Sequence, residues 1–512
     1  METLVIFIPC VLYNEIPGLL YGVTQQTEER VKSYFILGKY HKYKAPTNTR
    51  CKIIGYYCKE NLPMKSLSTH KEDWIVIGLK NSEFFLHKLS CNRDNKQCQT
   101  VCIIYDQKTF IDSQFLLHDS EFDGLAYKDQ FKALAKILNS NDCLYEYKSS
   151  LLLRNTFTQM IITVLLFVAN CLLRCVDLLN ILLKYTTLGL HLQLFLKSVA
   201  WVLQSCIGQR KLSVKVGNYI IASIVDICSG ILLLYWLMAI TSSPSQLLLD
   251  TGEVVVRTLR ELLQWVMGIP AGLKLNYAFN NMLGRFFLYH INLWWTFLVV
   301  SKPLLEITFH IFLYLGRLGL TFQASILADL LALVSFHIYC IYVYAARLYN
   351  LQVSGLVALW RLFLGRKYNP LRGRVDSCKY SPDQLFVGTL AFTILLFLLP
   401  TTFMYYIVFT SLRLVVVGLG GLLTRVRYVL QCLPLYISAL WLLQSTSISS
   451  TVHITVRQNE AESPLTLSVK PVASSWWKTV QHCMPEPVQP PPTVEWYNMV
   501  KNLISGNLIY PV

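Results

Sequence analysis

Charged residues are scarce in this sequence, and acidic residues are scarcest where it is most hydrophobic. Of 512 residues, 54% are hydrophobic and 15% are charged. Residues 151–445 hold 23 Lys and Arg against 9 Asp and Glu, whereas residues 1–150 hold 19 against 17 and residues 446–512 hold 4 against 4. A soluble protein rarely has this composition. Basic residues in short loops between apolar runs indicate a membrane protein rather than a nucleic-acid binder.

The sequence also lacks the cysteine patterns of metal sites and of secreted frameworks. None of its 15 cysteines forms a Cys-x-x-Cys pair, and it has no Asn-x-Ser/Thr acceptor. The spacings of Cys51 and Cys58, and of Cys91, Cys98 and Cys102, do not match zinc knuckles. We therefore expect scattered buried thiols, no metal, and polar parts that face a reducing, unglycosylated compartment.

Sugar-nucleotide chemistry is not visible in the sequence either. A metal-dependent transferase usually needs paired carboxylates under the diphosphate, and no Asp-x-Asp occurs. No Gly-x-Gly-x-x-Gly follows a strand, and Gly418-Leu-Gly-Gly421 lies in an apolar run typical of close helix packing. We expect no catalytic site and no cofactor in this chain.

Residues 1–150 are predicted to form a cytosolic α+β domain. Leu4–Pro9 is too short to span a membrane and favours a first buried strand. Three further β-rich runs and an amphipathic helix follow, at Trp74–Gly78, Phe84–Leu89, Thr100–Tyr105 and Tyr127–Leu138.

Residues 151–445 are predicted to form a multi-helix transmembrane region of about six to eight helices, so the fold class is a polytopic α-helical membrane protein. Apolar runs occur at residues 158–173, 188–207, 216–240, 286–311, 319–346, 384–412 and 428–443. Val254–Leu273 is ambiguous because charges interrupt it. If the basic loops at 210–215 and 361–379 are both cytosolic, an even number of spans must lie between them. The runs at 216–240, 286–311 and 319–346 make three, so Val254–Leu273 is required to cross as the fourth. Both termini are then expected to be cytosolic.

The most informative stretch is the basic loop before the run at 384–412. Pro370 biases Asn369 toward an extended conformation, and in an extended segment Arg372, Arg374 and Asp376 project on one side. Two guanidinium groups in this arrangement suit a phosphate or an acidic protein surface. Ordinary positive-inside charge is the alternative explanation.

The start of the helix that follows this loop is predicted from its capping residues. Ser381, Pro382 and Gln384 form a Ser-x-x-Gln capping box with proline at the first helical position. The helix is therefore expected to begin within a residue or two of Pro382.

Residues 446–512 are predicted to form a cytosolic β-rich tail with a proline-rich connector. Val452–Val456 and Leu465–Val469 favour strands, and Pro485–Thr493 is an extended connector. We expect the aromatic pairs beside the connector, Trp476-Trp477 and Trp496-Tyr497, to pack on the N-terminal domain, and docking on a partner is the alternative.

Two blocks of sequence resemble the PIG-Q family, the membrane subunits of the glycosylphosphatidylinositol N-acetylglucosaminyltransferase. One is Asn369-Pro-Leu-Arg-Gly-Arg-Val-Asp-Ser377 with Asp383–Pro400, and the other is Trp265–Asn276 with Gly284–Trp295. The resemblance covers roughly residues 150–445.

The resemblance implies a non-catalytic scaffold in the endoplasmic reticulum membrane. Its complex transfers N-acetylglucosamine from the UDP-sugar to phosphatidylinositol, which is the first step of making the lipid anchor. The partners it implies are the catalytic subunit PIG-A and the PIG-C, PIG-H, PIG-P and PIG-Y subunits.

Other polar residues in the apolar region leave different functions open. Lys274 and Asn276 are lower-ranked candidates for binding a lipid headgroup or a partner, with a helix terminus as the alternative. His290 with Asn292 suggests either an acyltransferase base or a hydrogen bond to another helix, a partner or a lipid headgroup. Asp226 and Asp329 fit an ion relay or partner pairing. A transporter and a stand-alone membrane transferase are the alternative functions.

Overall fold

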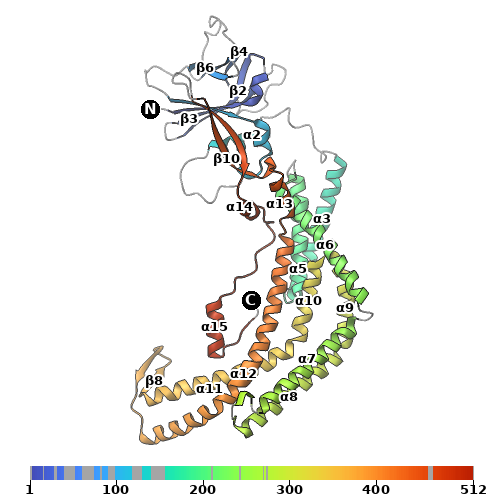
Figure 1. Ribbon diagram of the computed structural model, residues 1–512, viewed down its shortest axis with the longest axis vertical. Coiled ribbons are helices and arrows are strands. Elements are labelled where there is room, and N and C mark those ends of the chain that lie inside the picture. Colours follow the sequence, from blue (N-terminus) through green and yellow to red (C-terminus); the bar gives the residue numbers. More distant parts are fainter. Residues whose placement is uncertain are drawn as a thin grey trace. The chain divides into compact units, whose positions relative to one another are not determined.

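The computed structural model describes residues 3–14, 16–27, 31–39, 52–59, 74–80, 83–89, 99–117, 130–139, 156–208, 212–240, 244–268, 270–272, 275–458 and 465–510. The chain divides into two compact units, each built from three segments (Figure 1). Unit 1 contains Met1–Phe167, Trp201–Ile221 and Pro434–Pro485. Unit 2 contains Val168–Ala200, Ala222–Leu433 and Glu486–Val512. This division differs from the expected one at residues 150 and 445, because segments from both sides of each expected boundary share a unit.

Unit 1 is organised around a β-sheet, for which the described residues supply nine strands in the order β10-β11-β7-β1-β3-β2-β4-β5-β6. Strand β1 is central and pairs in parallel with both β3 and β7. The strands are β1 (Thr3–Pro9), β2 (Gly18–Thr27), β3 (Val31–Lys39), β4 (Lys52–Lys59), β5 (Ile75–Lys80), β6 (Glu83–Leu89), β7 (Gln99–Tyr105), β10 (Ser449–Gln458) and β11 (Leu465–Ala473).

Both faces of β1 are buried. Because side chains alternate along a strand, Leu4 and Ile6 join the core on one face and Val5 and Phe7 join the core on the other. The second core also contains side chains of α1 (Gln107–Asp112) and α2 (Gln130–Asn139). The first apolar run is therefore a buried strand, as expected.

The tail strands complete this sheet. Strand β11 pairs in parallel with β7, from Leu465 opposite Val101 to Val469 opposite Tyr105, and β10 pairs antiparallel with β11. Val469 is buried in the same core as Phe110. Without β11, the edge of β7 that faces away from β1 would lie unpaired. The tail strands thus belong to the N-terminal sheet rather than to a separate body.

A third apolar cluster in unit 1 joins short elements to the first turns of a long helix. It contains Phe115, Val214, Ile437, Ile448, Val480 and Cys483. These residues come in part from α13 (Leu435–Leu442), α14 (Trp476–His482) and the start of α6 (Val214–Ile240). The Val214 amide donates to Gln114 Oε1 at 2.8 Å, and Gln114 Nε2 donates to the Leu212 carbonyl at 3.2 Å.

Unit 2 is helical, apart from the short strands described below. Its helices are α7 (Pro244–Met267), α8 (Tyr277–Val300), α9 (Lys302–Leu315), α10 (Leu320–Val334), α11 (Phe336–Phe363), α12 (Pro382–Gln431) and α15 (Trp496–Ser505). Helices α3 (Thr156–Leu178), α5 (Thr187–Gly208) and α6 contribute to both units, and α4 (Asn180–Leu183) is a single turn. The core contains the buried side chains Trp294, Tyr342 and Tyr405.

Polar bonds accompany this packing. Tyr405 Oη donates to Asn280 Oδ1 at 2.7 Å, while Asn280 Nδ2 donates to the Met267 carbonyl at 2.9 Å. Trp294 Nε1 donates to the Val334 carbonyl at 2.9 Å. Each bond joins different elements of unit 2, so polar groups help to hold α7, α8, α10 and α12 together.

Within the described residues, four helices are long and apolar enough to cross a membrane: α3, α5, α6 and α12. Two bent pairs also qualify, α8 with α9 at 57° and α10 with α11 at 50°, so up to six spans are present if each pair counts as one. The expected six to eight helices are reached only at the lower limit. Helix α7, which covers most of Val254–Leu273, is not among the helices apolar enough to cross a membrane. The expectation that Val254–Leu273 crosses therefore has no support from this helix.

Helix α12 begins where the capping residues predict. Ser381 Oγ accepts from the Gln384 amide, the Gln384 side chain accepts from the Ser381 amide, and Pro382 is the first residue. The helix continues without interruption for 50 residues. The separate span expected at 428–443 is therefore wrong: α12 runs to Gln431, and α13 is a separate eight-residue helix after Pro434.

The C-terminal segment packs on α11 and α12. The Ile509 amide donates to Tyr342 Oη at 3.0 Å, and Tyr406 Oη donates to the Leu503 carbonyl at 2.7 Å. Trp496 and Tyr497 on α15 are exposed, in unit 2. The expectation that they pack on the N-terminal domain is therefore wrong, because the inward face of α15 is formed by other residues, such as Leu503.

Candidate functional site

The basic loop folds into a β-hairpin that connects α11 and α12. Its strands are β8 (Arg366–Asn369) and β9 (Arg374–Ser377), which pair antiparallel. Gly365 has φ +64° and lets the chain turn out of α11, while the Cys378 amide donates to the Gly365 carbonyl at 2.8 Å. Helices α11 and α12 pack along each other, with the hairpin at their shared end (Figure 1).

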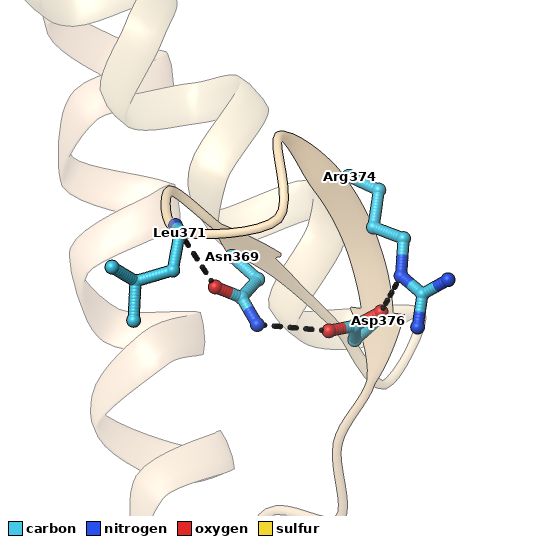
Figure 2. A network of polar contacts seen from close by, with 4 residues as sticks. All are labelled: Asn369, Leu371, Arg374 and Asp376. Carbon is cyan, nitrogen blue, oxygen red and sulfur yellow. Dashed lines mark hydrogen bonds and ion pairs between the residues drawn. The ribbon is translucent and has the colours of Figure 1, made fainter.

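One polar network holds the hairpin together (Figure 2). Asn369 Oδ1 accepts from the Leu371 amide at 3.1 Å, which fixes the turn, and Asn369 Nδ2 donates to Asp376 Oδ2 at 3.1 Å. The other Asp376 oxygen, Oδ1, accepts from Arg374 Nε at 2.8 Å. Asn369 thus links the turn to the opposite strand through one side chain.

The network separates the two arginines. Arg374 and Asp376 lie on the same side of β9, as the extended geometry predicts, and form an ion pair. Arg372 lies with Pro370 in the turn that precedes β9, so it is not on the strand with them. It is exposed, and no described acidic side chain forms an ion pair with it. Of these two arginines, Arg372 is therefore the one that lies outside the ion pair and is available to a ligand.

The tip of the hairpin combines positive charge with exposed apolar groups. The two strands and their turn carry Arg366, Lys367, Arg372 and Arg374 against a single acid, Asp376. Leu371 is 96% exposed, and Tyr368 is 50% exposed with the Arg361 guanidinium 6.0 Å from its ring centre. Such a tip suits an anionic surface that also offers apolar contact, such as a lipid headgroup region or an acidic protein patch.

The other candidate ligand residues do not join this site. Lys274 lies outside the described residues. Asn276 caps α8 by accepting from the Phe279 amide at 3.1 Å, which matches the helix-terminus alternative. His290 and Asn292 bond in different directions: His290 Nδ1 lies 2.9 Å from the Phe286 carbonyl, and Asn292 Oδ1 accepts from Arg260 Nη2 at 2.8 Å. They do not form a catalytic pair.

Two carboxylates within the apolar helices, Asp226 and Asp329, cap neighbouring helices. Asp226 accepts from the Thr321 amide at 2.9 Å and from Thr321 Oγ1 at 2.6 Å, at the start of α10. Asp329 accepts from the Thr187 amide at 2.7 Å and from the Leu188 amide at 2.9 Å, at the start of α5. Carboxylates are favoured at helix N-termini. This arrangement agrees with the pairing alternative.

Sequence reasoning missed His191, which lines a cavity with Arg427 and Gln431. The three positions are far apart in sequence, so no local pattern links them. The only available signal was the presence of His191 and Arg427 inside or beside apolar runs.

Comparison with known proteins identifies the family. The family model for the "N-acetylglucosaminyl transferase component (Gpi1)" matches residues 170–450. The mouse protein named phosphatidylinositol N-acetylglucosaminyltransferase subunit Q is 45% identical over 303 residues, covering 57% of this chain and 51% of the mouse protein. The human protein of that name is 50% identical over 224 residues, covering 43% of this chain and 29% of the human protein.

A more distant relative shows the same relationship. The Schizosaccharomyces pombe protein named N-acetylglucosaminyl-phosphatidylinositol biosynthetic protein gpi1 is 32% identical over 190 residues, covering 37% of this chain and 29% of the yeast protein. The chain spans about half the length of the mouse relative and less of the other two. No solved structure matches the chain. Because the family model covers more than half of the sequence and includes the hairpin, the chain belongs to the Gpi1 family, which includes the PIG-Q proteins.

Proposed function

We propose that this chain is a non-catalytic membrane subunit of a phosphatidylinositol N-acetylglucosaminyltransferase complex. The observation that carries the proposal is the family match over residues 170–450 together with relatives named as subunits of that enzyme. The complex would transfer N-acetylglucosamine from its UDP-sugar to phosphatidylinositol in the endoplasmic reticulum membrane. Both termini of the chain would be cytosolic.

The scaffold role is supported by what the polar residues of the helical region do. Asp226 and Asp329 cap helices, Asn280 connects α7 to α12, and Asn292 binds Arg260. These side chains hold helices to one another, which is what a subunit that organises others needs. The catalytic partner would be PIG-A, and the further partners PIG-C, PIG-H, PIG-P and PIG-Y.

Within this function, the β8–β9 hairpin is the proposed contact to an anionic group of a partner or a lipid headgroup. Arg372 would make the contact, because it is exposed and lies outside the ion pair of Arg374 with Asp376. Asn369 would support it indirectly, through its bonds to the Leu371 amide and to Asp376.

Affinity capture tests the scaffold role. Full-length tagged chain, expressed in cells that lack the endogenous subunit, is expected to recover a sugar-nucleotide-dependent glycosyltransferase in mild detergent and to restore N-acetylglucosaminyl-phosphatidylinositol synthesis in microsomes. The chain purified alone is expected to form no product from UDP-N-acetylglucosamine and phosphatidylinositol. Product without a partner would overturn the non-catalytic assignment, and failure to recover a transferase would overturn the scaffold assignment.

Charge reversal tests the hairpin. Arg372→Glu is expected to lower either transferase recovery, if the hairpin binds a partner, or synthesis by a fully assembled complex, if it binds a lipid headgroup. Arg210→Glu makes the same charge change in the other basic loop and is the control. Equal assembly and activity in both variants would remove the role of Arg372.

A further inference from the structure

A cavity with a largely apolar wall and a few polar groups lies within unit 2, between the start of α5 and the end of α12. Its volume is about 130 Å³, and its wall includes Leu190, His191 and Leu194 from α5 and Arg427 and Gln431 from α12. Gln489, from the C-terminal segment of unit 2, also lines the cavity. One water occupies about 30 Å³ in the liquid, so the cavity has room for a group of several heavy atoms.

His191 leaves a buried donor beside this cavity. The side chain is 4% exposed, and Gln431 Nε2 lies 3.4 Å from His191 Nδ1. Because an amide nitrogen only donates, Nδ1 accepts, and the neutral ring carries its hydrogen on Nε2. Nε2 is buried and has no hydrogen-bond partner among the described residues. A buried donor without an acceptor costs free energy, so an oxygen atom in the cavity would stabilise this arrangement.

Arg427 presents a second set of donors. Its Nη1 donates to Ser325 Oγ at 3.0 Å, while its Nε is buried and has no partner in the described part of the chain. The neighbouring carboxylate on α10, Asp329, interacts electrostatically with Arg427, but its oxygens accept hydrogen bonds from the Thr187 and Leu188 amides. The guanidinium thus keeps hydrogen-bonding capacity at Nε for an anion.

The surroundings indicate an amphipathic ligand. Leu190 and Leu194 form an apolar wall, and α5 and α12 are among the helices apolar enough to span a membrane. Arg427 lies near the end of α12, where basic side chains meet headgroups. Basic pockets between membrane helices bind anionic headgroups, and the guanidinium fork matches the oxygens of a phosphate.

We propose that this cavity binds the phosphate of an anionic membrane phospholipid, with Arg427 and His191 Nε2 donating to its oxygens. Gln431 orients the His191 ring, and Leu190 and Leu194 contact the glycerol and the first acyl carbons. The site is separate from the β8–β9 hairpin. It does not depend on the proposed transferase complex, because it is defined by binding alone.

Native mass spectrometry of the full-length chain in detergent tests the proposal. The probes are dioctanoyl phosphatidylglycerol, dioctanoyl phosphatidylcholine and inorganic phosphate, each titrated separately. Arg427→Gln is expected to weaken phosphatidylglycerol binding at least tenfold. Arg425→Gln makes the same change two residues away on an exposed side chain and is expected to bind as the unchanged chain does.

Each outcome decides the proposal. Equal phosphatidylglycerol binding by the two variants would overturn it. Inorganic phosphate binding as tightly as phosphatidylglycerol would overturn the assignment to a lipid, and equally tight phosphatidylcholine binding would overturn the requirement for an anionic headgroup. If Arg427→Gln does not elute as a folded species, Leu194→Trp fills the cavity from its apolar wall. Retained binding by that folded variant would also overturn the proposal.

Discussion

Asp226 illustrates how this chain accommodates charge within an apolar region. Its carboxylate accepts two hydrogen bonds from Thr321 at the start of α10. Gly319 has φ +151° and permits this close approach, because a Cβ there would lie 2.2 Å from Asp226 Oδ2. A cap supplied by a different helix holds α6 and α10 together, and it gives a structural reason for an acid that otherwise suggests ion transport.

Replacing Asp226 is expected to destabilise unit 2. Asp226→Ala removes the acceptor for both the Thr321 amide and its hydroxyl, and leaving buried donors unsatisfied costs about 1–3 kcal/mol. Asp226→Asn retains one acceptor oxygen and is expected to cost less. The measurement is the midpoint of thermal unfolding in detergent. Glu306→Ala, at an exposed acid on α9, is the control, and equal midpoints for Glu306→Ala and Asp226→Ala would contradict the capping role.

Two buried thiols in unit 1 are expected to be inert. Burial raises the pKa of the Cys102 thiol to about 11 and that of Cys483 to about 12, the latter despite the opposing effect of Lys215. Alkylation needs the thiolate, which these groups do not form near neutral pH. Maleimide at pH 7.5 should therefore leave both unmodified in the folded chain while Cys378, in the hairpin, reacts.

Peptide mass spectrometry before and after denaturation checks this expectation. Cys102 and Cys483 should become modified only once the chain is unfolded in detergent such as dodecyl sulfate. Modification of either at the rate of Cys378 in the folded chain would show that the thiol is accessible, against its 1% exposure in the structure.

At the scale of elements, helix α12 connects much of unit 2. At about 1.5 Å per residue, its 50 residues extend for about 75 Å, whereas a bilayer core is about 30 Å thick. It packs with α11 in one part and α10 in another, while α10 and α11 themselves meet at a 50° bend. The length of α12 could not be predicted from the sequence, because an apolar run predicts only the part of a helix that lies in the membrane and not how far the helix extends beyond it.

The C-terminal segment is the other element whose position depends on long-range bonds. Gly506 ends α15 with φ +69°, and Tyr342 Oη both accepts from the Ile509 amide at 3.0 Å and donates to the Asn507 carbonyl at 3.3 Å. Ile509 is buried in the main core of unit 2. One tyrosine hydroxyl thus satisfies two backbone groups of the segment.

Tyr342→Phe is expected to release this segment. The change leaves the buried Ile509 amide without its acceptor, at a cost of about 1–3 kcal/mol, so the local opening of residues 496–510 should become more frequent. Limited proteolysis followed by mass spectrometry should show about tenfold faster cleavage there. Tyr344→Phe, a half-exposed tyrosine on the same helix, is the control. Identical cleavage of both variants would exclude a role for the Tyr342 hydroxyl.

At the scale of the whole molecule, membrane topology depends on how the bent helix pairs are counted. If α8 with α9 and α10 with α11 each cross once, the β8–β9 hairpin and the loop at 212–213 face opposite sides. If one bent pair is re-entrant, they face the same side. The basic residues of the hairpin and those at 210–215 favour the same cytosolic side. With one re-entrant pair, however, the crossing of α12 would place β11 on the side opposite to β7, although the two strands pair in one sheet. We therefore predict that both bent pairs cross and that the hairpin faces the lumen, against the expectation from its basic residues.

Glycosylation mapping tests this topology. The sequence contains no Asn-x-Ser/Thr acceptor, so an inserted one reports without background. An acceptor placed after Leu371 is expected to be glycosylated, because a lumenal hairpin meets the lumenal enzyme. An acceptor inserted at residues 241–243, after α6, is expected to be glycosylated and is the control. An unglycosylated hairpin beside a glycosylated acceptor at 241–243 would contradict this topology and favour one re-entrant pair.

Much of the candidate hairpin could be predicted, but not its ion pairing. The extended geometry predicted that Arg374 and Asp376 share a side, since residues two apart in a strand do so. The turn placed Arg372 away from them, because Asn369 bonds to the Leu371 amide and starts the turn before β9. Which arginine is free therefore depended on one side-chain hydrogen bond that sequence spacing does not encode.

The sequence by itself determined the class of the protein, the apolar runs of α3, α5 and α6, the start of α12 at its capping box, and the buried strand β1. These features follow from composition, periodicity and capping, which act between residues close in sequence. Only the tertiary structure decided that β11 pairs with β7, that Asp226 and Asp329 cap helices distant in sequence, and that His191 meets Gln431 beside a cavity. Each of these contacts joins segments more than ninety residues apart, so its partner is selected by packing and by the need to satisfy buried polar groups.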